Sequence, residues 1–215
     1  NFSMPLAMFD IGIIELPLPI NEYVNSTRKV RPIGISTETD VDFDQLDNEV
    51  VLAGWGHVQR YYPAESTQFT NMKLINLTEC MKYQGHYIET ITKDHICTEK
   101  IKGMPCDGDS GSGIISLKTN KLIGLLSYVK DAEEGVDMGY NDCKSNIPAV
   151  STRVASYIDW ISSKTGLDFS KSEKICYSEG LVNAANIEKF DDCETIEGIV
   201  KITDESFIEM QPDRL

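Results

Sequence analysis

At 215 residues the chain is long enough for one or two domains, and its 41% of hydrophobic residues is enough to form a packed core. Its 34 acidic and 20 basic residues give a net charge of −14, which argues against a nucleic-acid-binding surface. No apolar run approaches the roughly 18 residues of a membrane-spanning helix. The first residue is not methionine and no leader-like segment is visible, so we expect an upstream part to be missing.

The first 48 residues predict a strand followed by a connector. Residues 10–16 are nearly all apolar, and Pro17 and Pro19 end this run. Residues 21–48 are polar and lack a clear period.

Residues 49–154 predict an all-β barrel, because short apolar runs alternate with turn residues. The clearest runs are residues 49–53, 113–117, 122–128 and 149–154.

Two short helices are expected beside these strands. The first covers residues 78–83, with Thr78 as its capping residue. The second covers residues 155–164, where Tyr157, Ile158 and Ile161 share one face, and Gly166 ends it.

The segment 106–113, Cys-Asp-Gly-Asp-Ser-Gly-Ser-Gly, places Ser110 on a tight glycine-rich turn. A serine hydroxyl becomes a nucleophile when a base takes its proton and backbone N–H groups stabilise the resulting oxyanion. Glycine lets a substrate carbonyl approach the backbone and permits positive φ angles. Alone, the segment also fits an ordinary polar surface turn.

The flanking sequence resembles the chymotrypsin-like serine proteases, with five matching segments in the family's order. An α/β-hydrolase elbow would need Gly-x-Ser-x-Gly followed by a helix, whereas here Ser112 replaces the second glycine and an apolar run follows. Besides the serine loop, the matches correspond to the strand of the triad aspartate, the first strand of the second barrel, the strand lining the cleft, and the closing strand with its helix: residues 9–16, 51–56, 122–128 and 148–161.

The resemblance implies a role for each residue of the candidate site. Ser110 would be the nucleophile and Asp10 would orient the base, while the N–H groups of Gly108 and Ser110 would form the oxyanion hole. Asp109 would pair with the amine that activation cleavage creates, and Ser127 would support Asp10 by a hydrogen bond. The alternative for Asp10 is a buried structural carboxylate. No cofactor and no metal are expected.

The family's histidine lies well upstream of the triad aspartate, and only nine residues precede Asp10. His57, His86 and His95 all lie downstream, and each is expected to be a surface or loop residue. We therefore expect an upstream-truncated protease, with its missing N-terminal half in cis, that is inactive by itself because a triad member is absent.

The resemblance also implies a substrate pocket lined by Met104, Ser127, Val129 and Ala149. Met104 stands six residues before Ser110, where trypsin-like relatives carry aspartate. Val129 and Ala149 stand where those relatives carry glycine. Such a pocket would select small or medium aliphatic side chains of peptide or protein substrates.

Six cysteines allow three disulfides. The protease resemblance implies the pairs Cys80–Cys97 and Cys106–Cys143, which indicate an oxidising, extracellular location. Sequons at Asn1, Asn25 and Asn76 agree with a secreted glycoprotein.

Residues 166–215 resemble the beginning of the L domain of epidermal growth factor and insulin receptors. In that family a cysteine pair, here Cys176 and Cys193, precedes the first strand of a right-handed β-helix. The apolar positions Ile196, Ile199 and Ile202 favour a strand over the alternative, a disordered acidic tail. One repeat cannot bury its own apolar face, so we expect weak order.

The expected fold is all-β: a chymotrypsin-like double β-barrel with mainly the C-terminal barrel present, a C-terminal helix, and a short α+β tail. The expected function is a serine endopeptidase. A non-catalytic protease homologue acting as an extracellular binding or regulatory module is one alternative, and a receptor-like protein is another. The expected divisions are a remnant of the first barrel with its connector, the second barrel with its helix, and the L-domain-like fragment: residues 1–40, 41–165 and 166–215.

Overall fold

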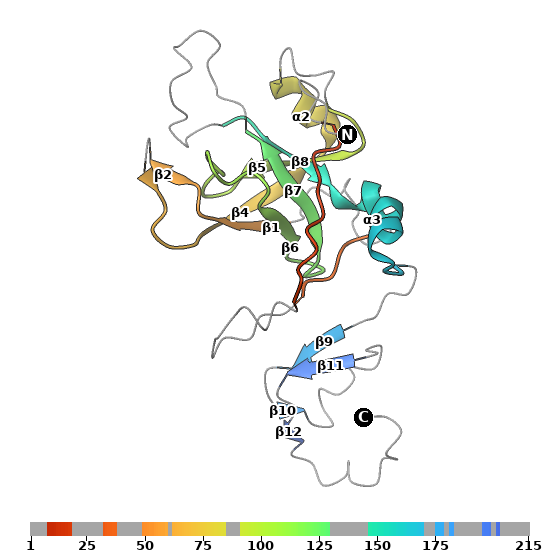
Figure 1. The fold of residues 1–215 in the computed structure, drawn as a ribbon. Helices are drawn as coiled ribbons and strands as arrows, with labels where there is room; N and C mark the ends of the chain where they lie inside the picture. Colours follow the sequence, from red (N-terminus) through yellow and green to blue (C-terminus); the bar gives the residue numbers. More distant parts are fainter. Residues whose placement is uncertain are drawn as a thin grey trace. The chain divides into compact units, whose positions relative to one another are not determined.

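The computed structural model describes residues 8–18, 32–37, 49–59, 62–84, 91–129, 146–169, 175–178, 181–182, 195–198 and 201–202. The chain divides into two units, Asn1–Leu167 and Asp168–Leu215. The first unit contains a closed antiparallel barrel with the strand order β1-β4-β5-β8-β7-β6 (Figure 1). Its strands are β1 (Glu49–Gly54), β4 (Gln68–Ile75), β5 (His95–Lys100), β6 (Gly113–Ser116), β7 (Leu122–Tyr128) and β8 (Ala149–Arg153).

Apolar side chains from all six strands fill the interior of the barrel. In β1, Val50 and Leu52 are buried while their neighbours are more exposed. Because successive side chains of a strand point to opposite faces, this alternation directs one row into the barrel. The interior cluster comprises Val50, Leu52, Met72, Leu74, Ile96, Ile114, Ile123, Leu126 and Ala149.

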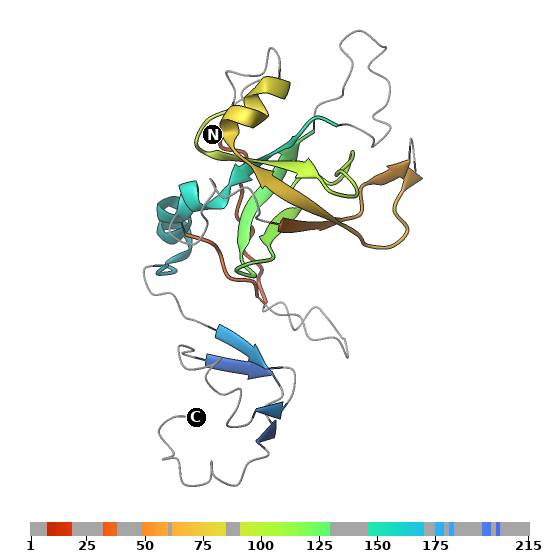
Figure 2. The same ribbon diagram turned by 180° about the vertical axis from the view of Figure 1, so that it is seen from behind.

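Helix α2 (Leu77–Tyr83) lies beside the barrel (Figures 1 and 2). A second cluster of buried side chains packs it against the barrel strands. Cys80 and Cys97 form a disulfide inside this cluster, as expected, with a Cα–Cα distance of 6.2 Å. The expected cap at Thr78 is wrong. Asn76 is the N-cap, and its side-chain oxygen accepts a hydrogen bond of 2.7 Å from the Glu79 N–H, which satisfies a free donor of the first turn.

The C-terminal helix of the first unit begins with a 3₁₀ turn, η2 (Val154–Tyr157), and continues as α3 (Ile158–Thr165). Gly166 caps it in the left-handed conformation, with φ of 74°, as the sequence predicts. Burial of Val154, Ala155 and Ile161 fixes this segment against the barrel.

The strand expected at residues 10–16 is not present. Residues 11–16 form no ladder with the described strands, and residues 12–18 are exposed. A closed barrel has no free edge, so this apolar run finds no strand with which to pair. The barrel strands β1, β6 and β8 differ from their expected bounds by one residue at one end.

The expected double barrel reduces to one six-stranded barrel in the described residues. A small antiparallel pair, β2 (His57–Gln59) with β3 (Tyr62–Pro63), extends beyond β1. No helix in the described part of the chain has the length and apolarity that crossing a membrane demands.

The second unit contains two parallel strand pairs. β9 (Ile175–Ser178) pairs with β11 (Thr195–Gly198), and β10 (Leu181–Val182) pairs with β12 (Lys201–Ile202). In both pairs the partner lies 20 residues further along the chain. This constant offset indicates two successive coils of the chain, whose strands pair in the same register.

Replacing Cys80 and Cys97 by alanine is expected to lower the free energy of unfolding by about 3 kcal/mol, because the disulfide closes a loop with a sequence separation of 17. Urea denaturation of the oxidised 215-residue chain measures the change. Each single variant already loses the disulfide, so the double variant should be destabilised about as much as either single variant. Losses of stability that add fully in the double variant would contradict this account.

Candidate active site

Ser110 stands exposed on the glycine-rich loop between β5 and β6. Gly108 and Gly111 have φ angles of 90° and 86°, a region that other residues rarely adopt. The Gly111 N–H donates to the Leu126 carbonyl at 2.7 Å, and the Leu126 N–H donates to the Ser112 carbonyl at 2.9 Å. The loop is therefore fixed to β7 directly after the serine.

The carboxylate of Asp109 holds the same loop from inside. Asp109 is only 8% exposed, and its two oxygens accept hydrogen bonds from the Gly56 N–H at 2.8 Å and the Cys106 N–H at 2.9 Å. A Cβ atom at Gly56 would lie 2.4 Å from the Asp109 Cγ, and one at Gly54 only 2.1 Å from its Oδ1. Both glycines are thus needed to let the buried carboxylate reach the backbone.

Ser127 on β7 contacts both expected triad residues. Its hydroxyl donates to the Asp10 Oδ2 at 2.7 Å, as expected from the sequence. Its carbonyl accepts a longer hydrogen bond, 3.4 Å, from the Ser110 hydroxyl. Residues 10 and 110, which are distant in the sequence, therefore lie on either side of one serine.

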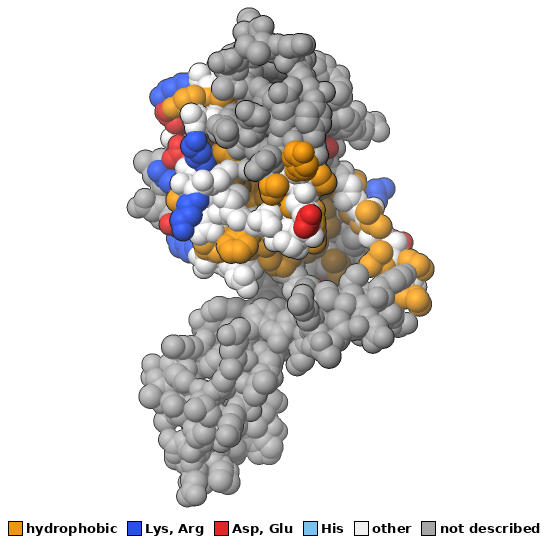
Figure 3. Space-filling view, turned by 90° about the vertical axis from the view of Figure 1, so that its left-hand side faces the viewer, with side chains coloured by type: hydrophobic (Ala, Val, Ile, Leu, Met, Phe, Trp, Pro, Cys, Tyr) orange, Lys and Arg blue, Asp and Glu red, His pale blue; other side chains and the backbone are white. Residues whose placement is uncertain are grey.

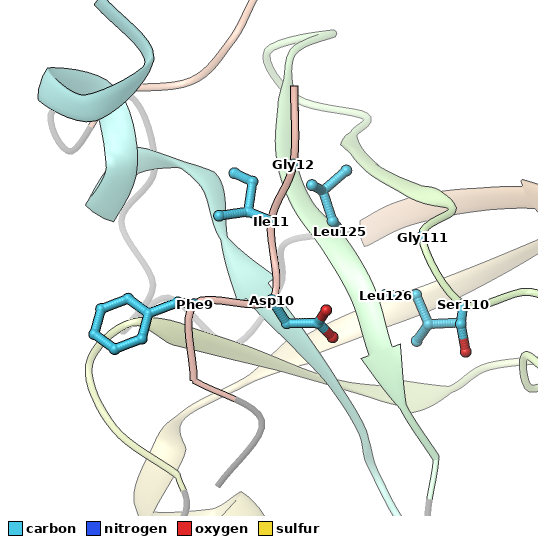
Figure 4. A pocket seen from close by; sticks show the side chains of 8 residues that line it. All are labelled: Phe9, Asp10, Ile11, Gly12, Ser110, Gly111, Leu125 and Leu126. Carbon is cyan, nitrogen blue, oxygen red and sulfur yellow. The ribbon is translucent and has the colours of Figure 1, made fainter. Parts of the chain in front are cut away.

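A hollow of about 610 Å³ lies between the two candidate residues. Figure 4 shows the Asp10 carboxylate directed toward the side on which Ser110 lies. The hollow is open to solvent and is lined by Phe9, Asp10, Ile11, Gly12, Ser110, Gly111, Leu125 and Leu126.

In the described part of the chain, two N–H groups of the serine loop donate to no backbone carbonyl. The Asp109 and Ser112 N–H groups donate to the Cys106 and Asp109 carbonyls at 3.0 and 2.9 Å. Within the described part of the chain, the N–H groups of Gly108 and Ser110 have no backbone carbonyl as an acceptor. These are the two donors for which the family resemblance implies an oxyanion hole.

The described histidines do not line the hollow. His57 lies in β2, where its backbone N–H donates to the Asp107 carbonyl at 2.8 Å. The expectation that His95 lies in a loop or on the surface is wrong: it begins β5, is 4% exposed, and its Nδ1 lies 3.2 Å from the Thr92 hydroxyl. His95 differs from the expectation because the barrel strand that it begins buries its side chain. His86 lies outside the described residues.

The expected pocket residues are partly or fully buried. Met104 and Val129 pack against the interior cluster, which includes the fully buried Ala149. Cys106 is disulfide-bonded. Its expected partner Cys143, and Cys193 of the other expected pair, lie outside the described residues, as does the side chain of Cys176.

Two residues that the sequence did not assign to the candidate site contact the Asp10 segment. The Thr152 hydroxyl donates to the Asp10 main-chain carbonyl at 2.9 Å. The Tyr157 ring meets Phe9 edge to face, with centroids 6.5 Å apart. Burial, reinforced by the negative charge of Asp94, raises the pKa of Tyr157, although a hydrogen bond with the Phe9 backbone opposes this rise. A single Thr or Tyr carries no motif that could have indicated these contacts.

In the described residues, histidine, cysteine and acidic side chains do not form a group of three or more that could hold a metal ion. The site therefore offers a hydroxyl, a carboxylate and backbone donors.

Comparison with known proteins shows the family to which the chain belongs. Residues 2–161 match the profile of the family described as Trypsin. The chain belongs to the trypsin family. It is 29% identical over 169 residues to a collagenase of Hypoderma lineatum, covering 78% of this chain and 58% of that protein. It is 27% identical over 164 residues to chymotrypsin-2 of Vespa crabro, covering 75% and 64%.

A further relative is transmembrane protease serine 11C of Mus musculus, 31% identical over 170 residues, covering 78% of this chain and 36% of that protein. A solved structure described as HL collagenase superposes with a TM-score of 0.52 at 28% identity, covering 65% of this chain and 56% of that one. The chain thus has a trypsin-family fold and spans less than two thirds of the length of these relatives.

Replacing Gly56 by alanine is expected to reduce stability by about 1–3 kcal/mol, because the new methyl group would displace the buried Asp109 carboxylate. Urea denaturation measures the change. Gly34→Ala is the matched control, because its Cβ would meet only the Lys121 Cγ, at 3.6 Å, an ordinary contact. Equal losses in both variants would show that the space around Asp109 does not matter.

Proposed function

We propose that this chain carries the nucleophile and the orienting carboxylate of a serine endopeptidase, Ser110 and Asp10. The supporting observation is Ser127, whose hydroxyl binds Asp10 and whose carbonyl binds Ser110, so that both face one hollow. An imidazole in that hollow could contact the carboxylate on one side and the serine hydroxyl on the other. That is the arrangement a serine nucleophile requires.

In the proposed reaction, Ser110 Oγ attacks the carbonyl carbon of the peptide bond while the imidazole takes its proton. The carbonyl oxygen becomes an oxyanion, bound by the N–H groups of Gly108 and Ser110. Asp10 orients the imidazole and stabilises its cation. The C–N bond then breaks, the amine leaves with that proton, and water releases the acyl group from Ser110 by the same steps in reverse order.

We propose that the imidazole comes from a protease segment outside these residues, and that this segment covers the exposed side of residues 12–18. Ile14 is 86% exposed, and Ile13, Leu16 and Leu18 are each more than 40% exposed. Hydrophobic patches are also visible on the face in Figure 3. Several exposed apolar side chains on one short segment favour burial by further polypeptide.

Ser110 of the 215-residue chain alone is not expected to react with a fluorophosphonate probe above the level of the Ser110→Ala variant. The histidines in the described part of the chain, His57 and His95, do not line the hollow, and loss of one triad member lowers reactivity by at least about a thousandfold. The complete translated protein is expected to be labelled at Ser110, with loss of fluoride. Mass spectrometry of the labelled peptide measures both reactions.

Two results would contradict the proposal. Labelling of the short chain would show that the missing imidazole is not needed. Failure of the complete, folded protein to react would favour the non-catalytic homologue, in which the site serves only for binding. An Asp10→Asn variant of the complete protein is the matched control, since it keeps the shape of the side chain but orients the imidazole wrongly.

We further propose that the substrate pocket accepts small or medium aliphatic side chains. Met104 and Val129 pack on the cluster that contains Ala149, and as pocket residues these three side chains would give the pocket apolar walls. Such a surface offers no counter-ion to lysine or arginine, whose burial without a partner is unfavourable.

The complete protein is therefore expected to cleave peptides after valine or alanine better than after arginine. Met104→Asp should shift the ratio of kcat/KM toward arginine by roughly tenfold or more, because it introduces a partner for the guanidinium group. Met104→Leu is the control and should keep the aliphatic preference. An unchanged ratio in the aspartate variant would place this residue outside the pocket.

We infer that the protease is extracellular, because the Cys80–Cys97 disulfide persists in oxidising compartments. We also propose that the second unit is the beginning of an L-domain-like β-helix. The two parallel pairs with their common 20-residue offset support this interpretation. The activation role of Asp109, pairing with a newly formed amine, is likewise part of the proposal.

A further inference from the structure

The backbone directly before Asp10 adopts an unusual conformation. Phe9 has a φ of 59°, in the left-handed region that bulky residues rarely occupy. The Ile11 N–H donates to the Phe9 carbonyl at 2.9 Å and closes a tight turn with Asp10 at its centre. A strained turn of this kind persists only where neighbouring contacts hold it.

Two residues of the closing strand and its helix supply such contacts. Thr152 is 2% exposed, and its hydroxyl donates to the Asp10 carbonyl at 2.9 Å. The Tyr157 ring packs edge to face on Phe9, with an interplanar angle of 82°. The turn is thus held at both of its first two residues.

Asp10 is also held by two hydrogen bonds, one to its side chain and one to its main chain. Ser127 on β7 binds the carboxylate, and Thr152 on β8 binds the main-chain carbonyl. β7 and β8 are neighbours in the barrel, with Leu125 opposite Thr152. A single bond from Ser127 would leave the residue free to pivot about the carboxylate, whereas the second bond removes this freedom.

We propose that Thr152 is a positioning residue, whose hydroxyl fixes the Asp10 main chain and thereby sets where the carboxylate meets the catalytic imidazole. This inference rests on the proposed endopeptidase function. Thr152 does not touch the substrate or the reacting atoms. It acts through Asp10, so its loss should reduce the rate of the chemical step while substrate binding stays the same.

The test compares Thr152→Val and Thr152→Ser in the complete protein. Valine keeps the branched shape and removes the donor, whereas serine keeps the donor. Thr152→Val is expected to lower kcat by about tenfold with KM changed less than about twofold, because small errors in catalytic geometry are costly. Thr152→Ser should restore most of kcat. The rates are divided by the number of active sites, counted by titration with an acylating ester, so that misfolded protein does not enter the comparison.

Thr165→Val is the matched control. The Thr165 hydroxyl donates to the Ile161 carbonyl at 2.8 Å at the end of α3, a side-chain-to-backbone bond of similar length outside the site. It also accepts a longer hydrogen bond, 3.2 Å, from the Leu167 N–H. This variant should leave kcat per active site unchanged. An equal loss in both variants, or an unchanged kcat in Thr152→Val, would overturn the proposal.

Hydrogen exchange of the 215-residue chain gives a readout that does not require activity. Amides of residues 9–12 should exchange faster in Thr152→Val than in Thr165→Val, and unchanged exchange would overturn the proposed anchoring. If the complete wild-type protein fails to react with the fluorophosphonate, the endopeptidase proposal fails first. The two failures are therefore distinguishable.

Discussion

A buried carboxylate determines the shape of the loop that presents Ser110. Asp109 is almost removed from solvent, and desolvation of a carboxylate is unfavourable unless hydrogen bonds compensate for it. The backbone N–H groups of Gly56 and Cys106 supply these bonds. Since Ser110 follows directly, the position of its hydroxyl depends on a carboxylate that takes no part in the proposed reaction itself.

Strand β7 connects this loop to the carboxylate at residue 10. Leu126 exchanges backbone hydrogen bonds with Gly111 and Ser112, and Ser127 binds Asp10 and Ser110. The closed barrel pairs β7 with both β6 and β8, which makes it a rigid support. Groups placed on such supports keep the geometry that catalysis requires better than groups on free loops.

The sequence allowed the barrel and the serine loop to be predicted, because each depends on a local pattern or a motif, and the Asp10–Ser127 bond was implied by the resemblance to a protease family. Short apolar runs bounded by turn residues predicted β1 and β7, and the segment around Ser110 was distinctive. The errors concern residues whose state depends on tertiary neighbours. The apolar run after Asp10 was expected to be a strand, but the closed barrel offers it no partner. Likewise, Asn76 and Thr78 are both good caps, and only the actual start of α2 distinguishes them.

The two proposed catalytic groups differ in how firmly the first unit holds them. Ser110 lies on a loop fixed through Asp109 on one side and β7 on the other. Asp10 lies outside any ladder of the described strands, and its position depends on the Ser127 and Thr152 hydroxyls together with the packing of Phe9 on Tyr157. Fewer contacts mean a lower free energy of local opening. Any polypeptide that covers the exposed residues 12–18 would therefore stabilise the carboxylate in place, so that delivery of the imidazole and ordering of Asp10 become one coupled event.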